Sequence, residues 1–201
     1  MKITNLTTAV LEANFDWVFL KVETDEKITG YAEVFVGPAV TSVIRAFRPV
    51  ILGQDPACFD RLVRRLRASS IHASPGLALH AIAGIESALL DIVGQRHGMP
   101  VWQILGGKYR DQVRIYSDCH AGGALHSITP LLIPRTPRWM QEPGAEAQDG
   151  VVSVKHHGWN AAEAETQTPQ SYARHAAETA AKGFRILKFD VDVPMPYETD
   201  E

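Results

Sequence analysis

The sequence lacks the features that mark membrane, secreted and nucleic-acid-binding proteins. No apolar run reaches membrane-spanning length, and the first residues, Met1 to Asn5, open into a strand-like pattern without the apolar core of a signal peptide. Charges of both signs are interspersed with a formal net charge of −3, so nucleic acid is not an expected partner. These absences predict a cytoplasmic protein, and a hydrophobic content of 45% supports an ordinary packed core.

Residues in metal-ligand or disulfide patterns are also scarce. Cys58 and Cys119 are the only cysteines and lie in unrelated contexts, which favours reduced thiols over a disulfide. His156-His157 are adjacent, so their side chains diverge in regular structure, and His120 with His126 lack a nearby cysteine or carboxylate at ligand spacing. The sequence therefore provides no candidate metal ligand.

The first residues, 1–36, have the alternation of a small antiparallel sheet. Val18, Leu20 and Val22 alternate with more polar positions, and the turn-rich Thr24 to Lys27 separates them from a second strand-like run, Ile28 to Val34. A polar loop is expected before this hairpin, from Glu12 to Asp16.

From Gly37 the apolar residues follow helical spacing. Three helices are predicted: one ending at Pro49, one after the Asp55-Pro56 start signal, and one from about Pro75 to His97. Their apolar stripes contain Val40, Val43, Ile44 and Phe47; Phe59, Leu62, Val63 and Leu66; and Leu77, Ala81, Ile85, Ala88, Leu89 and Ile92. A sheet followed by helices predicts an α+β domain over residues 1–111.

Residues 112–201 change to a β/α rhythm. Val113 to Tyr116 is a candidate strand, Ser171 to Lys182 is an alanine-rich helix that Gly183 can end, and an apolar run over residues 184–192 is a candidate buried strand. Helix, loop and strand in this order form the unit that α/β barrels repeat, so we predict a partial TIM-barrel domain. Residues from about 118 to 168 have no clear periodicity, which is typical of a functional lid or a disordered insertion.

Two ionisable residues stand together near the end of this last strand. Lys188 and Asp190 are two positions apart and so lie on the same face of the strand. Their place is the carboxyl end of a parallel strand, where barrel enzymes carry their chemistry.

Several motifs resemble those of a known family in order and spacing. These motifs are His80 to Ile92, Gly98 to Val101, Leu105 to Gly107 and Val113 to Tyr116. They are similar to the N-terminal capping region of the mandelate racemase and muconate lactonizing branch of the enolase superfamily. The resemblance covers residues 1 to about 117 and resumes over about 169–192. It implies an α+β capping domain followed by a modified TIM barrel, with Mg²⁺ and a proton-abstracting residue at the barrel mouth.

The resemblance also implies roles for two residues. Lys188-Phe189-Asp190 occupies the place of a Lys-x-Lys type motif that ends the second barrel strand in the family. Lys188 would stabilise the enediolate that forms when a proton α to a carboxylate is removed. Asp190 stands where relatives carry a second lysine, and a carboxylate is a weaker base at neutral pH unless burial raises its pKa. This departure argues against racemisation and favours loss of water from a sugar acid, with a base from a later strand.

Alternatives remain open for both candidate regions. Lys188 could instead lay its stem along the strand and extend its charge to solvent, or pair with Asp190 or Asp192. Asn14, Phe15 and Asp16 correspond to the part of the capping domain that closes over substrate in relatives, and they fit an ordinary solvated hairpin loop equally well.

The length sets a further expectation. A complete barrel takes about 250 residues, and only about 90 follow the capping region here. In the family, three acidic magnesium ligands end the third, fourth and fifth barrel strands, which would lie beyond residue 201. We therefore expect the front portion of an acid-sugar dehydratase, a lyase that is inactive alone. Its expected partners are a sugar acid, a chain carrying the rest of the barrel and further copies of itself. The alternative is a non-catalytic capping domain or remnant that only binds a partner chain.

Overall fold

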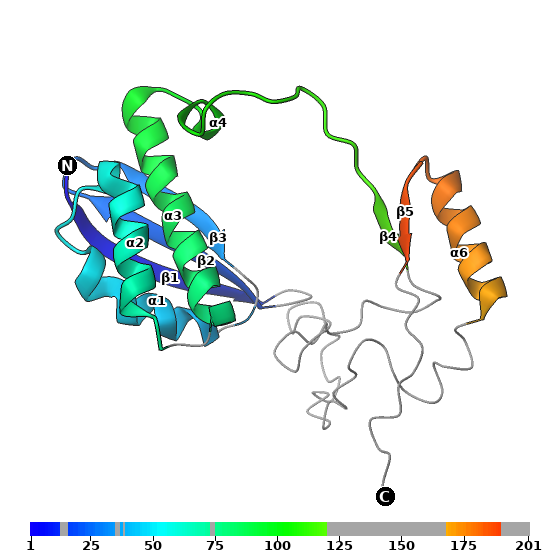
Figure 1. The fold of residues 1–201 in the computed structure, drawn as a ribbon, viewed down its shortest axis with the longest axis horizontal. Helices are drawn as coiled ribbons and strands as arrows, with labels where there is room; N and C mark the ends of the chain where they lie inside the picture. Colours follow the sequence, from blue (N-terminus) through cyan, green and yellow to red (C-terminus); the bar gives the residue numbers. More distant parts are fainter. Residues whose placement is uncertain (13–15, 35–36, 38, 73–74, 120–167, 190–201) are drawn as a thin grey trace, which may run out of the picture. The chain divides into compact units, whose positions relative to one another are not determined.

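The computed structural model describes residues 1–12, 16–34, 37, 39–72, 75–119 and 168–189 (Figure 1). These described residues fall into two compact units. The first contains residues 1–109, and the second contains residues 110–119 and 168–189.

The first unit is built on a three-stranded antiparallel sheet. Its strands β1 (Ile3–Glu12), β2 (Asp16–Thr24) and β3 (Thr29–Val34) are neighbours in the order β1-β2-β3. The alternation seen in the sequence is confirmed, because Val18, Leu20 and Val22 are all at most 1% exposed. The predicted loop Glu12 to Asp16 is shorter than expected, since these two residues are paired as the ends of β1 and β2.

Helices cover one face of this sheet (Figure 1). They are α1 (Ala39–Ile51), the 3₁₀ turn η1 (Pro56–Cys58), α2 (Phe59–Ser69) and α3 (Pro75–His97). The short α4 (Val101–Ile104) follows α3 and contacts that helix. The long α3 contacts strands β2 and β3 and helices α1 and α2. Its predicted stripe is confirmed: Ala81, Ile85, Ala88, Leu89 and Ile92 are fully buried, and Leu77 is partly buried against the core.

Helix α1 does not end at Pro49 as the sequence predicted. It continues to Ile51, whose side chain is fully buried, with Pro49 inside the helix. Proline lacks an N–H and so removes one intrahelical hydrogen bond. Pro49 lies in the last turn and is exposed, where water can satisfy the carbonyl that loses its donor.

Two glycines let α3 approach the sheet closely. A Cβ placed on Gly30 of β3 would lie 2.1 Å from the Ala88 carbonyl oxygen, and one placed on Gly84 of α3 would lie 2.7 Å from Val34 Cγ2. A side chain at Gly30 would therefore collide with the helix backbone, whereas one at Gly84 would collide with the side chain of Val34.

The expectation that no apolar run reaches membrane-spanning length was wrong. Among the described residues, Gly76–His97 of α3 is long and apolar enough to cross a membrane by length and composition alone. In this fold, however, the segment packs against the sheet and two helices, and much of it is buried. Its apolar character is thus that of a core helix.

The second unit contains two short strands, β4 (Ser117–Cys119) and β5 (Leu187–Phe189), which pair in parallel. Helix α6 (Pro169–Ala181) lies between them in the sequence and directly precedes β5. The strand predicted at Val113 to Tyr116 is wrong in position, because the strand that pairs with β5 begins at Ser117. Val113 and Ile115 are 74% and 67% exposed, so their alternation reflects no buried sheet face in the described residues. The change from sheet plus helices to a β/α order confirms the predicted fold class.

Candidate functional site

Lys188 lies at the centre of the short parallel pair. Its Cα is in register with that of Asp118 on β4, and the neighbouring registers join Ser117 to Leu187 and Cys119 to Phe189. The Ser117 N–H donates to the Ile186 carbonyl at 3.0 Å, which continues the ladder. The lysine therefore stands on a strand that pairs directly with the one following Tyr116, as the candidate site requires.

The surroundings of Lys188 differ from the predicted buried strand. Lys188 is exposed, and Ile186, two positions before it, is 38% exposed. Leu187 and Phe189, which alternate with them, are half-buried on the opposite face. The lysine side chain thus points to the less covered face of the strand.

Helix α6 holds β5 from the half-buried face. The rings of Tyr172 and Phe189 meet edge to face at a centroid distance of 5.7 Å. The helix begins with a capping box in which the Ser171 N–H donates to Thr168 Oγ1 at 3.2 Å and the Thr168 N–H donates to Ser171 Oγ at 3.0 Å. Gly183 follows the helix with φ +98°, a left-handed conformation that ends the helix as predicted.

The other predicted site residues are only partly described. Asn14, Phe15 and Asp190 lie outside the described residues. Asp16 is the first residue of β2, half-exposed, and its carbonyl oxygen accepts a hydrogen bond from the Gly37 N–H at 2.9 Å. Its backbone therefore ties the start of β2 to the segment before α1.

The described residues do not by themselves form a magnesium site. Within those ranges, no three side chains of histidine, cysteine, aspartate or glutamate gather into a group that could hold a metal ion. Cys58, in η1, is a free thiol.

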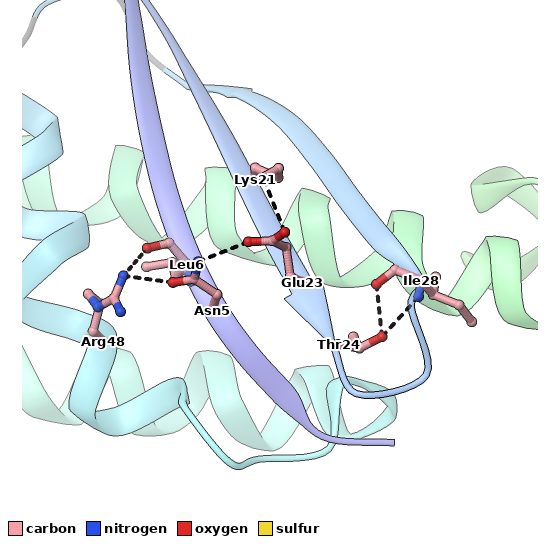
Figure 2. A network of polar contacts seen from close by, with 7 residues as sticks. All are labelled: Asn5, Leu6, Lys21, Glu23, Thr24, Ile28 and Arg48. Atoms are coloured by element: carbon pink, nitrogen blue, oxygen red, sulfur yellow. Dashed lines mark hydrogen bonds and ion pairs between the residues drawn. The ribbon is translucent and has the colours of Figure 1, made fainter.

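Sequence reasoning missed a polar network on the capping sheet (Figure 2). Glu23 accepts hydrogen bonds from Lys21 Nζ at 3.1 Å and from Asn5 Nδ2 at 2.9 Å. The hydrogen bond from Lys21, followed by that from Asn5, lowers the pKa of the Glu23 carboxyl. Arg48 Nη1 donates to Asn5 Oδ1 at 3.2 Å and to the Leu6 carbonyl. Arg48 comes from α1, more than forty residues away in the chain, and no local pattern connects it with Asn5.

The motifs, the fold and the place of Lys188 point to one family. A family model for the N-terminal domain of mandelate racemase/muconate lactonizing enzymes matches residues 4–106, just over half of the chain. The chain belongs to this family. It is thus a member of the enolase superfamily, as the order of its motifs indicated.

Known relatives of this family member include acid-sugar dehydratases. The chain is 30% identical over 201 residues to a D-xylonate dehydratase from Haloferax volcanii, which covers 99% of this chain and 39% of the relative. It is 42% identical over 120 residues to a D-galactonate dehydratase from Ralstonia pickettii, covering 58% of this chain and 31% of the relative.

A solved structure from Rubrobacter xylanophilus, a mandelate racemase/muconate lactonizing enzyme-like protein, is similar in fold. It is 27% identical, with a TM-score of 0.66, over 94% of this chain and 42% of that chain. The chain therefore spans well under half the length of these relatives.

Proposed function

We propose that residues 1–201 supply the capping domain, residues 1–111, and the beginning of the barrel, residues 112–201, of a magnesium-dependent acid-sugar dehydratase that works in the cytoplasm. The likeness to relatives named D-xylonate and D-galactonate dehydratase supports the substrate class. The observation that carries the proposal is Lys188 on β5, a strand paired in parallel with β4 directly after the capping domain.

The proposed reaction removes water from the sugar acid in two steps. A base takes the proton α to the carboxylate, and the resulting enediolate expels the β-hydroxyl group, which leaves as water after protonation. The enol product then tautomerises to a 2-keto-3-deoxy acid. The added negative charge on the carboxylate oxygens is the charge that the Lys188 ammonium would stabilise, because such a fixed cation acts on charge that develops in the transition state.

The other groups of this site are assigned by family resemblance. Asp190 stands beside Lys188 in the slot where relatives carry a base, with the general base itself supplied by a later strand. Asn14, Phe15 and Asp16 contact the substrate from the capping domain. Magnesium would supply Lewis-acid stabilisation of the enediolate, and the proposal places its ligands outside the described residues. Further barrel strands, on this polypeptide or on a partner chain, and assembly into a homo-oligomer belong to the same proposal.

A second candidate function is a non-catalytic capping domain that binds a partner chain. It is favoured by the core of the first unit: the buried cluster runs from Ile3 to Ile92 and draws on β1, β2, β3, α1, α2 and α3. All members of this cluster belong to the first unit.

A chimera separates the two functions. Residues 1–201 replace the matching residues of the Haloferax volcanii D-xylonate dehydratase, and formation of the 2-keto acid from a panel of aldonic acids is followed with and without Mg²⁺. The proposal expects Mg²⁺-dependent turnover that Lys188→Ala lowers by about 10²–10³-fold. Lys182→Ala is the matched control, because Lys182 is an exposed lysine at the end of α6, and it should keep the parent rate.

Two results would reject the dehydratase proposal. One is a chimera that is folded by circular dichroism and turns over none of the acids. The other is a Lys188→Ala chimera that works at the rate of the Lys182→Ala chimera. The first result together with stable binding of the 201-residue chain to a separate barrel segment would favour the second candidate.

A further inference from the structure

Each outer strand of the capping sheet has one edge to which a foreign strand could add. In the order β1-β2-β3, β1 and β3 each have a strand neighbour on one side only among the residues that the structure describes. In an antiparallel pair, alternate residues direct both their N–H and C=O groups to the same side. The groups on the open side form a row that can pair with another chain.

Over the first half of β1, the backbone groups on the edge away from β2 already have hydrogen-bond partners. The Ile3 N–H donates to the Gln54 carbonyl at 2.9 Å, and the Ile3 carbonyl accepts from the Gly53 N–H at 2.8 Å. Beyond the irregularity between Ile3 and Asn5, the next residue facing outward is Leu6. Its N–H donates to Asn5 Oδ1 at 2.9 Å and its carbonyl accepts from Arg48 Nη1.

Figure 2 shows where the guanidinium lies. Arg48 approaches β1 from the side opposite β2, so that it occupies the position which an added strand would take. Asn5 is itself held by its hydrogen bond to Glu23. The outward groups left on this edge belong to Thr8, Val10 and Glu12, which alternate with the residues that pair with β2. The contacts of Ile3 and Leu6 thus close the first half of β1 and leave its second half open.

The edge of β3 is closed in a similar way, by side chains of α3. The Tyr31 N–H donates to Asp91 Oδ2 at 2.9 Å, and the Thr29 carbonyl accepts from Gln95 Nε2 at 2.8 Å. Gln95 Nε2 also lies 3.0 Å from Asp91 Oδ2, so the two closing side chains support each other. Side chains of α1 thus hydrogen-bond to the outer edge of β1, and side chains of α3 hydrogen-bond to the outer edge of β3.

We propose that Arg48 on α1 and the Asp91–Gln95 pair on α3 are edge-blocking residues, which prevent a second copy of this chain from adding its β1 or β3 strand to the sheet. The committed partner is a second copy, because an antiparallel strand edge is complementary to itself about a two-fold axis. Once Arg48 is removed, the Leu6 carbonyl joins Thr8, Val10 and Glu12 on the open edge, and the run from Leu6 to Glu12 is longer than the typical strand of about 5–6 residues. This role is independent of the dehydratase proposal.

The test compares Arg48→Met with Arg45→Met in the full chain. Arg45 is exposed on the same helix and makes none of these contacts, so its variant controls for loss of one positive charge. Sedimentation measures self-association, and amide deuterium uptake over Leu6–Val10 is measured at low and high protein concentration. For Arg48→Met we expect about tenfold stronger association, the effect of one or two added hydrogen bonds, and uptake that falls as concentration rises.

A second substitution locates the new contact. Thr8→Pro removes an N–H from the middle of the exposed run without removing a bond to β2, since proline is tolerated where the N–H of an edge strand faces solvent. Added to Arg48→Met, it should return association to the parent value. Association and uptake of Arg48→Met that match those of Arg45→Met would overturn the proposal.

The β3 edge decides the matter if Arg48→Met does not fold. Gln95 is exposed, so Gln95→Ala leaves the core intact, and Ser87→Ala on the same helix is its control. Uptake over Thr29–Glu33 should fall with concentration in Gln95→Ala and stay constant in Ser87→Ala. Equal behaviour of the two variants would refute the proposal.

Discussion

Gly30 is the described glycine at which an added side chain would meet the closest neighbouring atom. It is buried in β3 beneath α3. In Gly30→Ala, the new Cβ would lie 2.1 Å from the Ala88 carbonyl oxygen and 2.7 Å from Ile92 Cγ1. The closest atom belongs to helix backbone, so relief requires α3 to move away from the sheet.

The expected cost is that of strong overpacking. Inserted methyl groups in packed cores cost about 1–3 kcal/mol, and contact with backbone places this one at the upper end. A loss of about 3 kcal/mol corresponds to a fall in Tm of more than about 10 °C for a unit of this size. Urea unfolding followed by circular dichroism measures the free energy directly.

Two glycines of α3, Gly84 and Gly76, calibrate the result. Gly84→Ala meets Val34 Cγ2 at 2.7 Å, a side-chain methyl group and not helix backbone, and should cost less. Gly76→Ala has nothing within 4 Å of the new methyl group and should stabilise by about 0.5 kcal/mol, since alanine is the better helix former. If Gly30→Ala unfolds at the same urea concentration as Gly76→Ala, the close approach of α3 to β3 is wrong.

Two further predictions concern single polar contacts. Because hydrogen bonds from Lys21 and Asn5 lower the pKa of Glu23, its contribution to stability is present above the ordinary glutamate pKa and is lost as pH falls through the lowered value. The Tm difference between the parent and Glu23→Gln should therefore shrink on acidification, and a difference independent of pH would contradict this. Thr168→Ala removes the acceptor of the capping box at the start of α6 and should destabilise that helix by about 1 kcal/mol. Amide exchange in α6 should be faster in Thr168→Ala than in the parent, while exchange in α3 stays the same. Equal exchange in α6 of the two proteins would refute the capping role.

The sequence was most informative where one element carries its own signals. Helix α3 was predicted from Pro75 to His97, and the structure has these bounds, because a proline at the first turn, an apolar stripe and Gly98 at φ +61° all act locally. The hairpin of β2 and β3 was also predicted correctly, because its one buried face requires the alternation of Val18, Leu20 and Val22.

It was less informative where the outcome depends on distant residues. Val113 to Tyr116 alternate as a strand should, yet a strand requires a neighbour, and in the described residues only Ser117–Cys119 meets β5. Pro49 suggested a helix end, but the burial of Ile51 in the core carries α1 past it. The edge contacts of Arg48 and Gln95 join segments far apart in sequence, so no spacing rule could reveal them.

The candidate site was predicted in part. A parallel strand carrying Lys188 was predicted from the order of helix, glycine and strand and from the family motifs. The preceding strand was expected at Val113–Tyr116, but β5 pairs with Ser117–Cys119. The exposure of Lys188 was not predicted, because it depends on what covers each face of β5. The roles of Lys188, Asp190, Asn14, Phe15 and Asp16 remain predictions.

The central claim is that the Lys188 ammonium stabilises an enediolate, and the turnover number of Lys188→Ala tests it most directly. In the dehydratase chimera at saturating Mg²⁺ and aldonate, we expect kcat to fall about 10²–10³-fold, the usual loss on removing one stabilising group from a transition state, while Lys182→Ala keeps the parent value. A Lys188→Ala enzyme that turns over as fast as the Lys182→Ala enzyme would contradict the account.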